Sequence, residues 1–434
     1  MSTRTSALFA LTPTAFWIWG RALLAAGLVF GLLLVLLIAW TGSSLLALFF
    51  TMALVALPGA VYLFKRPTLN LYVALAGFVV ITGYSKGFQI QEALYGLYFL
   101  SVLAYWFASR LFFYRDRLVR DPEDRALLFF LLYAGASAVW AVLFGAKIGT
   151  IIGEGLVLVM LLFYFPVKAA CLRSPRATKI VLGIIFWFAL FVSLRNVLEY
   201  REALSSATKL YQIAKGRVAL NEVLLMMPAL SMLACLLYAQ RRRSRVLLLG
   251  GFLVVFVGLV LTQSRGYWAA FLLGSLALFV FIDRRRKGRI LLLMGGGLGL
   301  VFLLGALLFE GFITIIVSGV FERFTSLGTA ITSDVSLVNR FYESLAVWDR
   351  IKVNPILGYG LGTPYHYFNI TVDATRDWAF VHNGFVGLWY KFGLVGLGLM
   401  VYFWGKSIWN GLRLFRMRQA PRLLRLTGLS AAVC

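Results

Sequence analysis

Apolar runs long enough to cross a lipid bilayer recur along most of this chain, and they limit its fold more than any other feature. A helix of about 20 apolar residues spans the roughly 30 Å hydrocarbon core, whereas a barrel strand needs only about half that length. Because water does not reach the backbone at that depth, each span must satisfy its N–H and C=O groups within its own helix. Transmembrane helices are therefore the expected structure.

The composition excludes a soluble globular domain. Hydrophobic residues make up 61% of the chain and charged residues 14%, whereas soluble domains have about 45–50% and about 25%. We predict an all-α integral membrane protein, a bundle of about twelve transmembrane helices in a single polytopic domain, residues 1–434. The expected spans are 22–40, 44–64, 69–85, 90–109, 126–143, 148–168, 180–194, 218–239, 246–263, 267–282, 290–309 and 384–404.

The net charge of +25 is unevenly distributed along the chain. If the N-terminus is cytoplasmic, the inner segments hold most of the Lys and Arg, including the clusters 241–245 and 284–287, whereas the outer segments are nearly neutral. This is the positive-inside pattern of membrane proteins. The basic clusters are therefore expected to contact anionic membrane lipids, and no nucleic-acid partner is predicted.

The two ends of the chain carry different patterns. The first apolar run follows a polar leader without a cleavable signal pattern, so we expect an uncleaved span there. Residues 426–434 are too few to cross a membrane and are interpreted as the start of a helix that the chain does not finish.

No sequence pattern indicates a disulfide, a metal or a cofactor. The three cysteines, Cys171, Cys235 and Cys434, have no paired spacing. Phosphate-binding loops, dinucleotide motifs and zinc motifs are not found in the sequence. The acidic residues of 121–124 are expected to form the solvated start of the span 126–143. We therefore predict no metal and no cofactor.

A hydrophilic segment, 310–383, interrupts the apolar runs on the outer side and is predicted to be one large loop containing short helices. Leu345, Trp348 and Ile351 recur at helical spacing, which predicts a small amphipathic helix from residue 343 to about 350. The proline at position 355 ends it. The following run 355–362 (PILGYGLG) requires a loop with glycine conformations.

His382 lies where this loop meets the next apolar run, and it is one of two histidines in the chain. A histidine titrates near neutral pH, which suits a general base for a sugar hydroxyl. A histidine near a helix start can also be a cap or a structural hydrogen-bonding group, and both interpretations stay open. Asn383 is expected either to orient His382 or to cap the next span. His366, flanked by tyrosines, is interpreted as loop packing.

Arginines on the outer side are candidates for binding a diphosphate, because a guanidinium carries a permanent charge and a planar fork of donors. The candidates are Arg265, Arg195, Arg340 and Arg217. Arg265 lies in a short turn between two spans, where a charge is costly unless it meets a partner. Interfacial snorkelling is the alternative interpretation for arginines at span ends. Arg340 can instead pair with Glu343 on one helix face.

Three further ionisable residues, Glu92, Glu154 and Lys391, lie in or near predicted spans. Such positions are functional candidates because a charge in hydrocarbon is costly. The sequence assigns them no role, and pairing within the bundle is an equally good interpretation.

These motifs, in this order, resemble those of the O-antigen ligase and polymerase superfamily of bacterial inner-membrane proteins. The resemblance covers roughly residues 190–400. It rests on Ser264-Arg265-Gly266, on Arg340 followed by Trp348, on the run 355–362, and on His382-Asn383-Gly384 before the run 393–396.

The resemblance implies a membrane glycosyltransferase that takes a glycan from undecaprenyl diphosphate at the periplasmic face of the inner membrane. We expect an O-antigen ligase, which transfers O-antigen to a hydroxyl of lipid A–core by an inverting, metal-independent displacement. His382 is then the base, and the four arginines bind the diphosphate. The alternatives are a polymerase of the same superfamily, which differs in its acceptor, and a transporter of lipid-linked glycan. A transporter is expected to show two related halves or broken helices.

Overall fold

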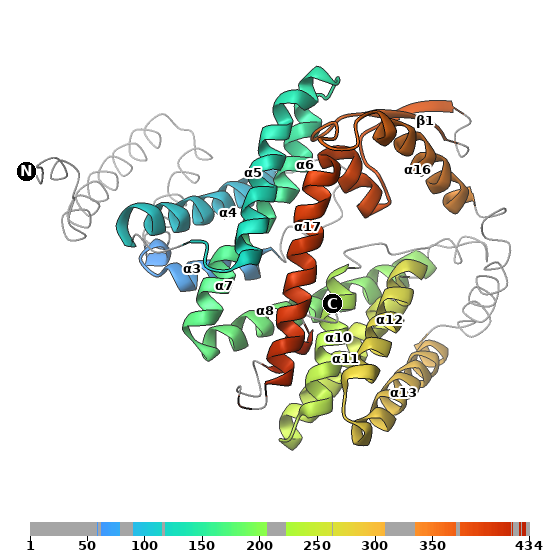
Figure 1. Ribbon diagram of the computed structural model, residues 1–434. Helices are drawn as coiled ribbons and strands as arrows, with labels where there is room; N and C mark the ends of the chain where they lie inside the picture. The colour runs from blue at the N-terminus through green and yellow to red at the C-terminus, as the bar shows by residue number, and fades with distance from the viewer. Residues whose placement is uncertain are drawn as a thin grey trace, which may run out of the picture. The chain divides into compact units, whose positions relative to one another are not determined.

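The computed structural model describes residues 59, 62–78, 90–114, 118–205, 223–262, 264–308, 335–369, 374–417, 419, 425–426 and 428–430, and most of them are helical (Figure 1). They fall into two compact units. The smaller unit contains α3 (Pro67–Gly77), α4 (Ile90–Ala108) and the π-helical turn η1 (Ser109–Tyr114). The predicted span 22–40 and most of 44–64 lie outside the described residues, and the single polytopic domain stays a prediction.

The larger unit contains the remaining described elements. Its helices are α5 (Pro122–Leu143), α6 (Ile148–Met160), η2 (Leu161–Phe163), α7 (Tyr164–Arg173), α8 (Pro175–Ser205), α10 (Val223–Tyr238), α11 (Arg242–Leu261), α12 (Arg265–Phe281), α13 (Arg284–Leu308), α16 (Val335–Val353) and α17 (Gly384–Arg416). Along the chain, two strands, β1 (Tyr365–Asn369) and β2 (Ala374–Trp378), follow α16 and precede α17.

Among the described residues, five helical segments are long and apolar enough to cross a membrane, and all five coincide with predicted spans. They are Pro122–Leu143, Ile148–Arg173, Pro175–Glu199, Arg242–Leu261 and Gly384–Arg416. Two shorter apolar helices, Leu225–Tyr238 and Gly266–Phe281, coincide with two more. The helical, multi-pass architecture agrees with the prediction, whereas the number of twelve spans stays a prediction.

Helix α17 packs along α5, and this pair carries a buried core (Figure 1). Phe130 of α5 meets Phe392 of α17 edge to face, with ring centroids 5.3 Å apart. Ala134, Leu361 and Met400 complete the buried cluster. Because Leu361 belongs to the glycine-rich run, the cluster joins the loop before α17 to two helices that are able to cross a membrane.

Helix α17 is broken at Gly393, which has a φ of 60° and a ψ of −169°. A side chain at this position is strained, and a Cβ would overlap the carbonyl oxygen of Ile356. The close approach of residue 356 shows that the glycine-rich run is inserted at the break. As predicted, this run uses glycine conformations, with positive φ at Gly358, Gly360 and Gly362.

The inserted run replaces the helical hydrogen bonds that the break removes. The N–H of Tyr359 donates to the carbonyl of Tyr390 at 2.9 Å, and the N–H of Gly360 donates to the carbonyl of Lys391 at 2.7 Å. Beyond the break, the N–H of residue 394 donates to the carbonyl of Pro355, also at 2.9 Å. Backbone groups at membrane depth must be satisfied within the protein, and here a loop from outside the helix satisfies them.

The predicted loop segment 310–383 also contains a β-hairpin, which the sequence interpretation did not predict. Strands β1 and β2 pair antiparallel, from Tyr365 opposite Trp378 to Asn369 opposite Ala374. The expectation of short helices alone was therefore incomplete. Helix α16 (Val335–Val353) confirms a helix here, but Leu345 and Trp348 of the predicted apolar face are exposed, and the buried face carries Val347 and Ile351. Buried tyrosines alternate with exposed residues in β1. Such an alternation with a period of two is typical of a strand. In a segment of five residues, however, it is too short to be a strong signal.

Candidate active site

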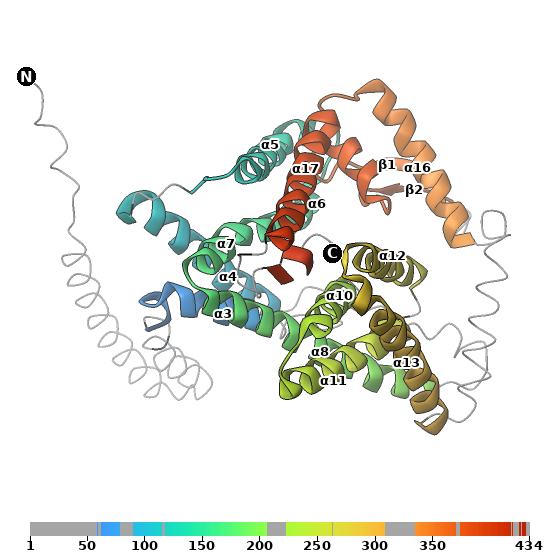
Figure 2. The same ribbon diagram turned by 60° about the horizontal axis from the view of Figure 1, so that its bottom comes forward.

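His382 is bonded to Glu343, a residue of α16. Helix α16, the hairpin and the start of α17 lie side by side (Figure 2), which brings the two residues together. The imidazole Nδ1 of His382 lies 2.7 Å from the Oε2 atom of Glu343. The peptide N–H of His382 donates to Oε1 of the same carboxylate at 2.6 Å. Both carboxylate oxygens therefore hold one histidine.

The two partners differ in their access to solvent. The Glu343 side chain is 3% exposed, whereas that of His382 is 41% exposed. A buried carboxylate is costly unless it is hydrogen-bonded, so the two bonds from His382 stabilise Glu343 in this position. The orienting group is thus inside the protein, and the group that it orients reaches the surface.

A cluster of buried tyrosines and aliphatic side chains lies beside the buried Glu343. Its members are Val347, Ile351, Tyr359, Tyr365, Tyr367, Val381 and Tyr390. Burial, together with the nearby Glu343 carboxylate, raises the pKa of Tyr365. The Tyr365 hydroxyl therefore keeps its proton, and it donates to the carbonyl of Phe380 at 2.7 Å. This bond fixes the backbone two residues before His382.

The geometry assigns distinct roles to the two ring nitrogens. With a carboxylate acceptor at Nδ1, the neutral imidazole carries its proton there, and Nε2 is left as the acceptor. The ring of Phe380 contacts the imidazole edge to face, with centroids 5.1 Å apart. A base held by an orienting carboxylate can take a proton from a hydroxyl, and the carboxylate then stabilises the imidazolium.

Sequence reasoning missed Glu343 as a site residue. One alternative paired it with Arg340, but both Glu343 oxygens contact His382, and the Arg340 side chain is exposed one turn earlier on α16. A signal was available in the sequence. Glu343 shares a helix face with Val347 and Ile351, and an acid on an apolar face needs a buried partner.

Asn383 is the N-cap of α17. Its side-chain oxygen accepts from the N–H of Val386 at 3.4 Å, which satisfies one of the free donors at the helix start. Capping is one of the two roles expected of Asn383. The group that the structure places against the imidazole Nδ1 is the Glu343 carboxylate.

The arginine candidates have different surroundings. Arg195 lies on α8, with its Nε 3.5 Å from the carboxylate of Glu199 one turn later. Arg265 is the first residue of α12, and Arg217 lies outside the described residues. The ring and hydrogen-bond contacts described for His382 are with Phe380 and Glu343. Binding of a diphosphate by the four arginines therefore stays a prediction.

The second histidine differs from its expected role. His366 was interpreted as loop packing, but it lies on β1 with its side chain 61% exposed. Its Nδ1 pairs with the carboxylate of Asp377, the residue directly opposite on β2. The strand alternation that buries the flanking tyrosines turns His366 outward.

Glu154 of α6 and Lys391 of α17 form an ion pair at the break in α17. The other carboxylate oxygen of Glu154 accepts from the N–H of Gly362 at 2.7 Å. Charges in a membrane span are normally paired inside the protein, and this pair also anchors the glycine-rich run. Glu92 belongs to α4, but its side chain lies outside the described part of the chain.

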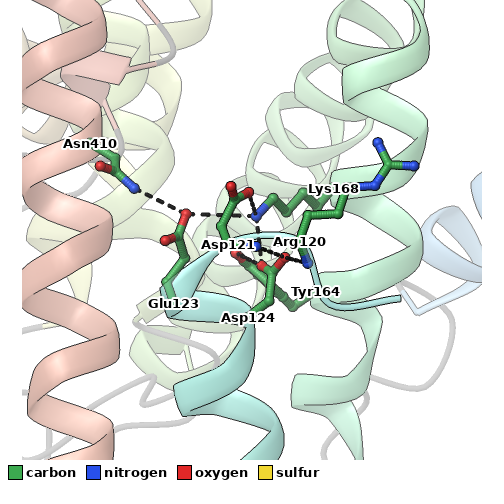
Figure 3. A network of polar contacts seen from close by, with 7 residues as sticks. All are labelled: Arg120, Asp121, Glu123, Asp124, Tyr164, Lys168 and Asn410. Atoms are coloured by element: carbon green, nitrogen blue, oxygen red, sulfur yellow. Dashed lines mark hydrogen bonds and ion pairs between the residues drawn. The ribbon is translucent and has the colours of Figure 1, made fainter. Parts of the chain in front are cut away.

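The acidic residues at the start of α5 form a buried network with two other helices (Figure 3). Oxygens of Asp121, Glu123 and Asp124 lie within 4.8 Å of one another, a spacing suited to a metal. The ammonium of Lys168 lies 2.6 Å from both aspartates, and Asn410 donates to Glu123 at 3.0 Å. Lys168 thus supplies the cation. The predicted solvated helix start was wrong for Glu123 and Asp124, which are buried because they bridge to α7 and α17.

Comparison with known proteins adds a family match. Residues 250–401 match the family model described as O-antigen ligase. The matched segment runs from α11 into α17, so it contains both Glu343 and His382. No curated protein and no solved structure matches the chain.

Proposed function

From the membership of the O-antigen ligase superfamily that this match supports, we propose that the protein is an O-antigen ligase of the bacterial inner membrane. It transfers O-antigen polysaccharide from undecaprenyl diphosphate to a hydroxyl of lipid A–core. The reaction takes place at the periplasmic face, with inversion at the anomeric carbon and without a metal ion.

The observation that carries the proposal is the hydrogen-bonded pair of Glu343 and His382. His382 stands directly before α17, one of the helices able to cross a membrane. Its ring is partly exposed, and with the carboxylate at Nδ1 its Nε2 can accept a proton, as a base for a lipid-linked substrate requires. The Glu343 carboxylate, which bonds both the ring and the backbone of His382, would hold such a base in place.

The proposed reaction proceeds in one displacement. The acceptor hydroxyl gives its proton to Nε2 of His382 while its oxygen forms a bond to the anomeric carbon of the donor sugar. The bond from that carbon to the phosphate oxygen breaks, and undecaprenyl diphosphate leaves with the electron pair. Attack opposite the leaving group inverts the configuration. The Glu343 carboxylate stabilises the imidazolium that forms.

The leaving diphosphate requires positive charge, which we assign to arginines. Guanidinium groups bind phosphate oxygens in a bidentate manner and are permanently charged. Preorganised cations in a site shielded from water stabilise a developing charge more strongly than water does. The residues proposed for this role are Arg265, Arg195, Arg340 and Arg217.

Two other functions were open from the sequence. A polymerase of the same superfamily uses the same donor and differs in its acceptor, so it requires the same base. A transporter was expected to show broken helices, and α17 is broken at Gly393. Transporters use the bare helix ends at such breaks to bind ions or substrates, whereas here loop residues bond the backbone groups at the break. This difference favours transfer chemistry.

The test is a transfer assay with the full chain in liposomes. The protein is mixed with undecaprenyl-diphosphate-linked O-antigen, lipid A–core and a chelator, and the products are separated on a gel. A ladder on lipid A–core is the expected result. Longer lipid-linked glycan without a lipid A–core product would assign the polymerase instead. A glycan that crosses the bilayer without any new bond would assign transport.

A further inference from the structure

Two aromatic rings beside His382 are exposed although the backbone around them is fixed. Phe380 is 57% exposed and Trp378 is 42% exposed. Phe380 contacts the His382 ring, and its carbonyl accepts from the hydroxyl of Tyr365, a fully buried residue. An exposed apolar ring is common on protein surfaces. A ring held against a proposed base is a more specific arrangement.

The hairpin register places Trp378 on the same side as the site. Trp378 lies directly opposite Tyr365, and opposite residues of an antiparallel pair project to the same face. Tyr365 and Tyr367 of this face belong to the cluster that packs against α16. Phe368 and His366 alternate with these tyrosines, so they lie on the other face.

The surroundings of the two rings are polar. All residues of β2 are exposed, and Arg376, which lies opposite Tyr367, shares the hairpin face of Trp378. The guanidinium of Arg376 offers hydrogen-bond donors that the hydroxyl oxygens of a sugar can accept. A pyranose ring suits such a surface, because its C–H faces pack on an aromatic ring while its hydroxyls meet polar groups.

We infer that Phe380 and Trp378 form a sugar-binding surface for the acceptor, with a pyranose ring packed on Phe380 beside Nε2 of His382. The inference rests on the proposed function, in which the hydroxyl that gives its proton to His382 belongs to the acceptor. The sugar next to the base is therefore the acceptor sugar. Trp378 contacts a more distant part of the same oligosaccharide.

The test uses variants that remove aromatic character at each position. Phe380→Leu and Trp378→Leu should each raise the KM for lipid A–core about three- to tenfold, the effect of losing one aromatic contact. Phe380→Tyr and Trp378→Phe should keep the KM near that of the unchanged protein. Phe368→Leu is the matched control, because Phe368 is 47% exposed on the opposite hairpin face. Its KM should not change.

A second acceptor separates sugar binding from lipid binding. Deacylated core oligosaccharide should show the same rise in KM with the two leucine variants. A rise confined to the acylated acceptor would overturn the inference, since the rings would then contact acyl chains. An unchanged KM in both leucine variants would overturn it as well.

Binding without turnover separates this inference from the proposed function. Saturation-transfer NMR with the full chain in nanodiscs measures the affinity for deacylated core oligosaccharide. Weaker binding by the leucine variants supports the sugar-binding surface even if the unchanged protein transfers nothing, a result that would refute only the ligase. Equal binding by all variants would refute the surface.

Discussion

The carboxylate of Glu343 bonds both the ring and the backbone of His382 across 39 residues of sequence. One bond sets which ring nitrogen carries the proton, and the other fixes the chain from which the ring projects. The histidine is therefore restrained in both tautomer and position. Such preorganisation is what a general base requires, because a small misplacement of the reacting groups slows a reaction strongly.

Replacing His382 by alanine should abolish most of the transfer while the protein stays folded. A general base contributes about 10²- to 10⁴-fold to a rate. The fold should persist because alanine keeps the peptide N–H that donates to Glu343. The initial rate in the liposome assay measures the loss, and size-exclusion chromatography in detergent checks the fold. His366→Ala is the matched control, since His366 also pairs with a carboxylate but lies on the outward hairpin face. Equal activity of the two variants would rule out His382 as the general base.

Glu343→Gln should lower kcat about 10- to 100-fold, the usual effect of losing a group that orients a functional histidine. The glutamine amide can donate to Nδ1, which would move the imidazole proton to Nε2, the atom that must accept. The KM for lipid A–core should change little, because Glu343 is buried away from substrate. Glu343→Asp, which keeps the charge, should recover part of the rate. A change in KM alone would argue for a structural role.

Gly393→Ala should destabilise the protein strongly. The backbone conformation of Gly393 is essentially restricted to glycine and costs a residue with a Cβ about 1–3 kcal/mol, and this Cβ would also overlap the backbone of Ile356. Gly398→Ala in the same helix is the matched control, because a Cβ there meets nothing within 4 Å. Thermal unfolding in detergent should show a lower midpoint for Gly393→Ala and an equal or higher one for Gly398→Ala. Equal midpoints would contradict the inserted loop.

Removing one partner of the Glu154–Lys391 pair should be worse than removing both. An unpaired charge inside the protein costs about 3–5 kcal/mol, whereas replacing the whole pair is often nearly neutral. The variants are Glu154→Gln, Lys391→Met and the two combined, compared by unfolding midpoint in detergent. Glutamine keeps an acceptor for the N–H of Gly362. Strictly additive losses would show that the two charges do not interact.

Local patterns predicted the helical part of the fold well. The span 126–143 and the helix Pro122–Leu143 agree, as do 246–263 and Arg242–Leu261. Length and apolarity suffice there because a membrane helix satisfies its backbone within one segment. The hairpin was missed for the opposite reason. The hydrogen bonds of Tyr365–Asn369 come from another strand, and five residues carry little periodicity of their own.

The sequence by itself determined which described helices are long and apolar enough to cross a membrane, that residues 355–362 need glycine conformations, and that His382 stands at the start of such a helix. Each of these follows from residue types in a short window. Only the tertiary structure decided that Glu343 holds His382, that the glycine-rich run closes the break at Gly393, and that Phe380 lies against the imidazole. These relationships depend on how α16, the hairpin and α17 pack together. The residues that packing brings into contact are far apart in the chain, and no local sequence pattern indicates that they meet.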